Sequence, residues 1–232
     1  MSNEGSVLVV AAHPDDEVLG CGGTIARMAY DGRSVHVLLL ADGENSRASA
    51  DGSGVAVGAV TARNAAAEKA CQILGCASVE CLNMPDNRMD TLALIDIVKE
   101  IEARITHYAP RTVMTHYGND VNVDHRVVHE AVIVACRPTP GHPVQELLFF
   151  EVMSSSEWRP PGSGYGFEPN YFVDISATLA LKNLALDAYS SEMREYPHPR
   201  SKLAIKSLAR WRGATVGATA AEAFLMGRKI IR

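Results

Sequence analysis

The chain has 232 residues, of which 47% are hydrophobic, and its formal net charge is -5. This acidic balance argues against binding to nucleic acid or to an anionic membrane surface. There is no apolar run of about 20 residues that could span a membrane, and no basic segment precedes an apolar one at the N-terminus. We expect a single α/β domain over residues 1–232, because a chain of this length can bury one sizeable core. The five cysteines, an odd number, favour a reducing compartment and so a cytoplasmic protein. The sequence leaves open whether the chain forms a homo-oligomer.

Apolar runs and helical periodicity alternate along the first two thirds of the chain. We predict strands near residues 6–12, 34–41, 78–82, 111–116 and 146–151, with helices near 17–31, 60–74, 91–107 and 123–136. This order predicts a core over residues 6–151 with a Rossmann-like, doubly wound and mainly parallel sheet, and helices on both of its faces. Residues 42–58 are rich in Gly, Ser, Ala and Asp, a composition typical both of a lid beside a site and of an ordinary surface loop.

The C-terminal segment, residues 152–232, departs from this alternation and is expected to complete the site with a loop and helices. Ser176 is predicted to cap a helix that runs to about Glu195, and a last helix is predicted to begin near Ser201. Between these helices, His198 lies between two prolines in a rigid turn.

The most informative segment runs from Val7 to Glu17, where an apolar strand leads into His13, Pro14, Asp15, Asp16 and Glu17. Ligands of open α/β sheets bind at the carboxyl ends of strands. A catalytic zinc usually has three protein ligands, so a distant segment should supply another donor. The best candidate is Asp124-His125, which also follows a predicted strand. In a parallel sheet, His13, Asp16 and His125 can meet at one edge.

On these residues the chain resembles the LmbE-like, or PIG-L (N-acetylglucosaminyl-phosphatidylinositol de-N-acetylase), family of zinc deacetylases. The resemblance spans residues 6 to about 136. It rests on Ala12 to Glu17 with Gly20 to Thr24 following, Asp124-His125, Arg63, and Pro85-Asp86 with Arg88. Further along the chain, the segments that resemble a bacterial branch of the family are Ser155 to Trp158, Pro197 to Ser201 and Ala221 to Phe224.

The resemblance implies that His13, Asp16 and His125 bind Zn²⁺ and that Asp15 is the general base. The chemistry agrees, because zinc lowers the pKa of bound water to about 7 and a neighbouring carboxylate can move the proton. The implied activity is removal of the acetyl group from an N-acetylated amino sugar or its conjugate. Nitrogen and oxygen ligands select metals weakly, so Fe²⁺ or another divalent ion could replace zinc.

One position departs from the family pattern. Many relatives have His-Pro-Asp-His where this chain has Asn-Val-Asp-His, and Asn122 cannot carry a proton. Either zinc and Asp15 suffice, or His116 or His198 takes over the role of the missing histidine. Asp124 is a candidate catalytic residue whose role stays open.

Two further positions match residues that contact the sugar in relatives. Arg63 lies on a predicted helix and Asp86 follows a predicted strand; an arginine could hold a hydroxyl or phosphate oxygen, and an aspartate a sugar hydroxyl. A solvated arginine on an amphipathic helix and ordinary turn chemistry at Pro-Asp-Asn are the structural alternatives.

Other interpretations of the motifs carry less weight. The acids after His13 could simply favour a helix N-terminus, but this leaves Asp124-His125 unexplained. His125 and His129 have the spacing of a His-Glu-x-x-His protease, yet Arg126 occupies the glutamate position. Gly20 to Gly23 match a dinucleotide site only in part, and close helix packing explains them better. The alternatives to sugar deacetylation are an amidase on a non-sugar compound and a non-catalytic small-ligand-binding protein.

Overall fold

The computed structural model describes residues 5–43, 57–160 and 162–231. One seven-stranded sheet runs through it in the order β3-β2-β1-β4-β5-β7-β6. The strands are β1 (Val7–Ala11), β2 (Val35–Ala41), β3 (Ser78–Met84), β4 (Thr112–His116), β5 (Glu146–Phe150), β6 (Tyr171–Asp174) and β7 (Ala221–Lys229). The first five are parallel, which confirms the predicted α/β fold with a mainly parallel sheet.

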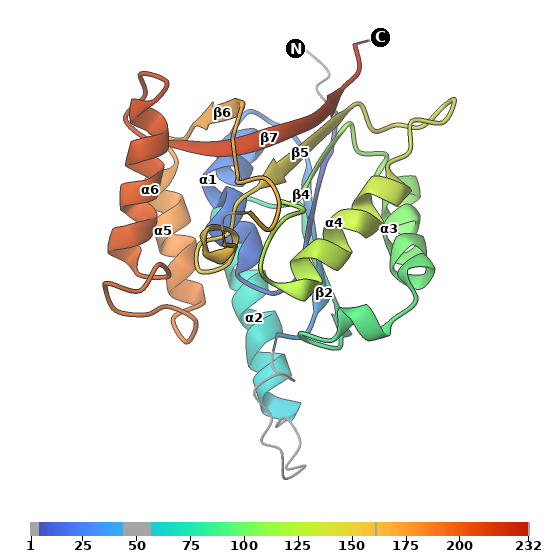
Figure 1. Cartoon of the computed structure of the whole chain (residues 1–232), viewed down its shortest axis with the longest axis horizontal. Helices are drawn as coiled ribbons and strands as arrows, with labels where there is room; N and C mark the ends of the chain where they lie inside the picture. The colour runs from blue at the N-terminus through green and yellow to red at the C-terminus, as the bar shows by residue number, and fades with distance from the viewer. Residues whose placement is uncertain (1–4, 44–56, 161, 232) are drawn as a thin grey trace.

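Helices cover both faces of this sheet (Figure 1). They are α1 (Asp16–Tyr30), α2 (Val57–Leu74), α3 (Leu94–Tyr108), α4 (Val123–Ala135), α5 (Leu179–Ala188) and α6 (Lys202–Ala214). In β1, Val7 and Val9 pack toward α1, α2 and α5, whereas Leu8 and Val10 pack toward α3 and α4. Because alternate residues of this central strand face two hydrophobic layers, the strand reads as one continuous apolar run.

The C-terminal segment contributes two strands that the sequence did not predict. Strand β7 inserts between β5 and β6 and is antiparallel to both, so the sheet is mixed at this edge. The helix predicted from Ser176 to about Glu195 was wrong at both ends, because α5 spans only Leu179–Ala188. Ser176 donates its backbone N–H to the carboxylate of Asp174, which closes a turn before the helix begins. The last helix, in contrast, begins near Ser201 as predicted, and Ser201 caps α6 by accepting the N–H of Ala204.

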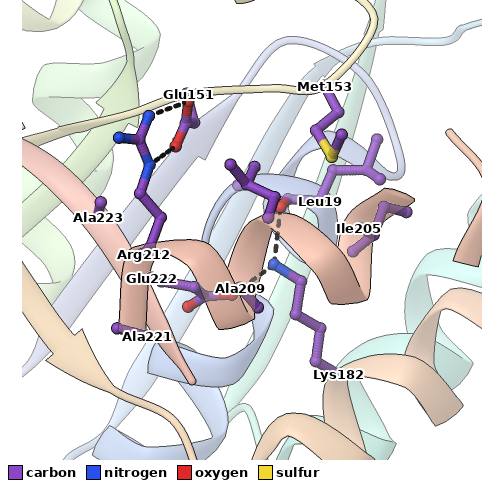
Figure 2. Close-up of a pocket in the computed structure, with 12 residues that line it drawn as sticks. Leu19, Glu151, Met153, Lys182, Ile205, Ala209, Arg212, Ala221, Glu222 and Ala223 are labelled. Atoms are coloured by element: carbon purple, nitrogen blue, oxygen red, sulfur yellow. Dashed lines mark hydrogen bonds and ion pairs between the residues drawn. The ribbon is translucent and has the colours of Figure 1, made fainter. Parts of the chain in front are cut away.

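Helix α1, which begins at Asp16, is interrupted at Cys21, whose backbone angles (φ -145°, ψ 22°) are not helical. At this break, Lys182 of α5 donates to the carbonyl oxygen of Leu19 at 2.8 Å. Glu222 of β7 accepts the N–H of Gly23 at 3.0 Å and pairs with Lys182. Figure 2 shows Lys182 between Leu19 and Glu222. The buried ion pair thus satisfies backbone groups that the broken helix leaves open.

The glycines of α1 serve packing, as the sequence analysis favours. A Cβ at Gly20 would overlap the ring of Phe150, and one at Gly23 would overlap Ile175. Among the described residues, no helix is long and apolar enough to cross a membrane. All five cysteines are free. Of the predicted loop over residues 42–58, the stretch 44–56 lies outside the described residues, and α2 already begins at Val57.

Candidate active site

The three predicted metal ligands converge at the carboxyl ends of two neighbouring parallel strands. His13 follows β1, Asp16 is the first residue of α1, and His125 lies in the first turn of α4, after β4. Asp16 Oδ2 is 3.1 Å from His13 Nδ1 and 3.2 Å from His125 Nε2. All three side chains are buried. The structure therefore brings together the donors that the sequence predicted to meet.

Two buried atoms in this cluster make no hydrogen bond: Asp16 Oδ1, and His125 Nε2, which meets only the ion-pair contact with Asp16 Oδ2 at 3.2 Å. Orphaned buried polar atoms are rare in folded proteins, and an ion is one of the ordinary reasons for them. Two imidazole nitrogens and one carboxylate form a donor set that zinc accepts. The residues present fit a divalent metal ion.

Each histidine of the cluster has a carboxylate behind it. Asp124 Oδ2 lies 2.9 Å from His13 Nε2, and Asp120 Oδ2 lies 3.2 Å from His125 Nδ1. Carboxylates on the outer nitrogen of a ligand histidine fix its orientation and tautomer. Asp124 also accepts the backbone N–H groups of Asn87 and Met89, at 2.7 and 3.0 Å. Asp124 therefore orients His13, and Asp120 orients His125. Asp120 was not predicted from the sequence.

His13, Asp86 and Asp124 form a second group of donors close enough to hold an ion. In this group both carboxylates face the same atom, His13 Nε2, at 3.1 and 2.9 Å. Asp124 is further committed to the two backbone amides described above. The orphaned atoms belong to the first group, which is therefore the better metal site.

Asp15, the predicted base, has a backbone conformation that L-residues rarely adopt (φ 123°, ψ -27°). Its N–H donates to Glu17 Oε2 at 3.1 Å, and the hydroxyl of Tyr189 donates to Glu17 Oε1 at 2.6 Å. Burial raises the pKa of Glu17 to about 7, although the bond from Tyr189 favours its ionised form. Glu17 and Tyr189 therefore hold the strained turn that carries Asp15.

The side chain of Asp15 meets Arg200, from the turn that precedes α6. Arg200 Nη1 is 2.8 Å from Asp15 Oδ2, and Arg200 Nε donates to Ser154 Oγ at 2.8 Å. Burial raises the pKa of Asp15 to about 6, and the charge of Arg200 opposes this rise. His198 was the residue predicted from this turn, but Arg200 makes the contact with Asp15.

Neither candidate for the missing histidine faces the cavity that Asp15 lines. His116 is fully buried, accepts the N–H of Ala12 at 2.8 Å and stacks on His125 with ring centroids 3.9 Å apart. Burial and His125 hold its pKa well below the usual range. His198 accepts the N–H of Arg200 at 3.0 Å. The structure thus places His116 behind the metal ligands and His198 beside the turn of Arg200.

Asn122 stands at the departure from the family motif and caps α4. Its Oδ1 accepts the N–H of Asp124 at 2.8 Å, and its Nδ2 donates to Asn87 at 3.3 Å. His129, one helical turn beyond His125, hydrogen-bonds the carbonyl oxygen of His116 at 2.9 Å and packs against the ring of Phe149. Its ring thus supports β4 and the sheet.

A cavity of about 90 Å³ opens beside the candidate metal ligand His13. The two predicted substrate residues, Arg63 and Asp86, both line this cavity, and so does Glu192, which was not predicted. The full lining is His13, Asp15, Gly43, Arg63, Asp86, Asn87, Asn122, Glu192 and Arg200. Arg63 is only 5% exposed and pairs with Glu192 at 2.9 Å. Glu192 and Arg200 lie in turns rather than at strand ends, and although Arg200 falls in the segment Pro197 to Ser201, neither was predicted as a site residue.

Comparison with known proteins agrees with this geometry. The family model described as PIG-L, GlcNAc-PI de-N-acetylase, matches residues 8–136. The uncharacterized deacetylase YaiS of Escherichia coli (strain K12) is 32% identical over 184 residues, which cover 77% of this chain and 86% of that protein. The diacetylchitobiose deacetylase of Thermococcus kodakarensis is 28% identical over 196 residues, covering 82% and 70% of the two chains.

Two further similarities extend the comparison. The 4-oxalmesaconate hydratase of Pseudomonas putida is 29% identical over 213 residues, covering 81% of this chain and 74% of that protein. The crystal structure of a conserved protein from Thermus thermophilus matches with a TM-score of 0.74 at 27% identity, covering 98% and 96% of the two chains. The fold therefore extends over nearly the whole chain, whereas the activities of these relatives include both deacetylation and hydration.

Proposed function

The chain belongs to the PIG-L family, the GlcNAc-PI de-N-acetylases, and on that premise we propose that it is a zinc-dependent hydrolase that removes the acetyl group from an N-acetylated amino sugar or its conjugate. The observation that carries the proposal is the pair of orphaned atoms, Asp16 Oδ1 and His125 Nε2, beside a buried carboxylate at Asp15. The sugar class is supported by the diacetylchitobiose deacetylase among the relatives. His13, Asp16 and His125 would hold the ion.

A bound zinc ion supplies Lewis-acid chemistry, polarising the amide carbonyl and lowering the pKa of water. The protein supplies the proton transfers. Asp15 takes a proton from the attacking water and passes it to the departing amine as the C–N bond breaks. Arg200, 2.8 Å from Asp15 Oδ2, orients this carboxylate and favours its ionised form. The products are acetate and a free amine.

Asp15 performs both proton transfers in this proposal. Asn122 cannot carry a proton, and its Oδ1 is committed to the cap of α4. His116 donates no proton to the cavity, because it lies behind the ligands and its Nε2 accepts the N–H of Ala12. We assign His116 and Asp124 to supporting the ligand histidines, and His198 to the turn that presents Arg200.

The test is acetate release by metal-assayed protein from a panel of N-acetylated sugars, sugar nucleotides and glycosides, with a chelator arm and zinc add-back. We expect release that the chelator abolishes and zinc restores. Parallel loading with Fe²⁺ decides which ion supports turnover, since the donor set accepts both. Bound metal without acetate release from any sugar would redirect the proposal to a non-sugar amide. Protein that binds no metal after zinc loading would contradict the site.

A hydratase is the second candidate, favoured by the similarity to the 4-oxalmesaconate hydratase. The same ion and the same base could activate water for addition to a carbon–carbon double bond. That reaction releases no acetate, so the acetate assay and loss of absorbance by an unsaturated acid separate the two activities.

We also propose that residues 1–232 form one domain that works in the cytoplasm. The single sheet that contains all seven described strands supports one domain, and the five free cysteines support a reducing compartment such as the cytoplasm.

A further inference from the structure

We propose that Glu192 makes this enzyme selective for neutral, hydroxyl-rich N-acetylated sugars over phosphorylated or carboxylated ones, an inference that rests on the proposed deacetylase function. Glu192 lies in the turn after α5 and is 2% exposed. A carboxylate this deeply buried must be paired to stay ionised. Its partners are the two arginines of the cavity.

Arg63 is the first of these partners and is held on several sides. Its Nη2 lies 2.9 Å from Glu192 Oε1 and donates to the carbonyl oxygen of Gly43 at 3.0 Å. Its Nη1 donates to the carbonyl oxygen of Pro14 at 3.4 Å. The guanidinium therefore joins the ends of β1 and β2 to the turn after α5, and its charge is matched inside the protein.

Arg200 is the second partner and lies between two carboxylates. Its Nη1 is 2.8 Å from Asp15 Oδ2 and 3.8 Å from Glu192 Oε2. Along the cavity wall the charges therefore alternate in the order Arg63, Glu192, Arg200, Asp15. Each positive charge faces a negative one before any substrate enters. Without Glu192, the two guanidiniums would share only Asp15 on this wall and would attract an anionic substituent.

The remaining lining of the cavity presents groups that bind hydroxyls. Asp86 accepts from Asn87 Nδ2 at 3.0 Å, and Asn122 Nδ2 donates to Asn87 Oδ1 at 3.3 Å. Amide and carboxylate groups of this kind exchange hydrogen bonds with sugar hydroxyls. Among the charged side chains that line the cavity in the described part of the chain, carboxylates outnumber guanidiniums. A bound metal ion adds positive charge at His13, but a phosphate or carboxylate group meets like charge where it lies beside Glu192.

The experiment compares N-acetylglucosamine with N-acetylglucosamine 6-phosphate on the zinc-loaded enzyme, with kcat/KM from acetate release. We expect the neutral sugar to be preferred by about tenfold or more, the effect of one unit charge in a partly solvated pocket. Glu192→Gln keeps the shape of the side chain and removes its charge, so the preference should fall by about tenfold. Glu195→Gln, an exposed glutamate three positions further on, is the matched control and should leave the ratio unchanged.

The ratio separates selectivity from a structural role. If Glu192 only stabilised the fold, Glu192→Gln would lower kcat/KM for both sugars by the same factor, and the proposal would be overturned. A wild-type enzyme that prefers the phosphorylated sugar would overturn it as well, while leaving the deacetylase function in place.

Two measurements on the wild type keep the proposal testable if Glu192→Gln does not fold. Raising the salt concentration should narrow the preference for the neutral sugar, because ions screen the repulsion; a wider preference would contradict the proposal. Calorimetry with the same two sugars and zinc-loaded protein measures their binding apart from turnover. Tighter binding of the neutral sugar is expected even in a protein that releases no acetate, and tighter binding of the phosphate would overturn the proposal.

Discussion

The residues that would hold the metal and the residues that support Asp15 come from different parts of the fold. His13, Asp16 and His125 lie where β1 and β4 end, in the parallel half of the sheet. Tyr189 and Arg200 come from turns beside α5 and α6, in the C-terminal segment next to the antiparallel edge. Because the candidate metal ligands and the residues that support Asp15 come from different segments, we expect that metal binding and base activation can be lost separately. Variants of the ligands and of the supporting residues test this separation.

The largest effect is expected from His125→Ala. Because this change removes one of three ligands, zinc content should fall to that of chelator-treated protein, and acetate release should fall with it. Metal analysis after gel filtration measures the first and the acetate assay the second. His129→Ala, one turn further along α4, is the matched control and should keep the metal. His129 is not one of the candidate ligands, and its ring hydrogen-bonds the carbonyl oxygen of His116 instead. Equal zinc content in wild type and His125→Ala would remove this residue from the ligand set.

Asp15→Asn should separate loss of the general base from loss of the metal most clearly. The amide keeps the shape of the side chain but cannot accept the proton, so kcat should fall by about 100-fold to 10,000-fold. Zinc content should stay at the wild-type value, because Asp15 is not among the three ligands. Metal-loaded Asp15→Asn with full turnover would show that another group is the base.

The parallel half of the fold could be predicted because most of its strands are short, mainly apolar runs, and β1, β4 and β5 are buried throughout. The antiparallel strands could not. Strand β7 begins with Ala, Glu, Ala, Phe, Leu and Met, several of which are good helix formers, and it contains Gly227, so its sequence does not favour a strand. Glu222 becomes buried only because Lys182 and the broken turn of α1 meet it, contacts that depend on tertiary packing.

The same distinction holds within the site. The convergence of the three candidate ligands could be predicted because His13 and Asp16 are three residues apart after one strand, and because His125 also follows a strand. Neither Arg200, in the segment Pro197 to Ser201, nor Glu192 follows a strand, and a charged residue in a turn is usually solvated. Their importance follows from burial against Asp15 and Arg63, which only the folded chain shows.

Asp120→Asn is expected to weaken the metal site without destroying it. Asp120 Oδ2 lies 3.2 Å from His125 Nδ1 and accepts the hydroxyl of Ser156 at 2.7 Å. Loss of the carboxylate behind a ligand histidine typically reduces metal affinity by about 10-fold to 100-fold. Competition with a chromophoric chelator measures this change, and Asp31→Asn, an exposed aspartate at the end of α1, serves as the control. Unchanged affinity would mean that His125 is oriented without Asp120.

The smallest effect is expected from Tyr189→Phe, which removes one hydroxyl from the C-terminal segment. That hydroxyl holds Glu17 at 2.6 Å, and Glu17 in turn accepts the N–H of Asp15 at its unusual φ of 123°. Because the pKa of Glu17 is about 7, this bond contributes between the roughly 0.5 to 1.5 kcal/mol of a neutral hydrogen bond and the roughly 1.5 to 3 kcal/mol of a charged one, and part of this energy maintains the strained turn. We therefore expect kcat to fall by about tenfold, equivalent to about 1.4 kcal/mol, with KM and zinc content nearly unchanged.

The control for this variant is Tyr30→Phe, because Tyr30 is 89% exposed. The readout is the split between kcat and KM on metal-assayed protein. If zinc content fell together with kcat, Tyr189 would support the ligand Asp16 rather than the base Asp15. Such a result could arise because Asp15 and Asp16 share the turn that Glu17 holds. If kcat did not change, the backbone of Asp15 would be held by the turn itself, and the separation between the two halves of the fold would not extend to Tyr189.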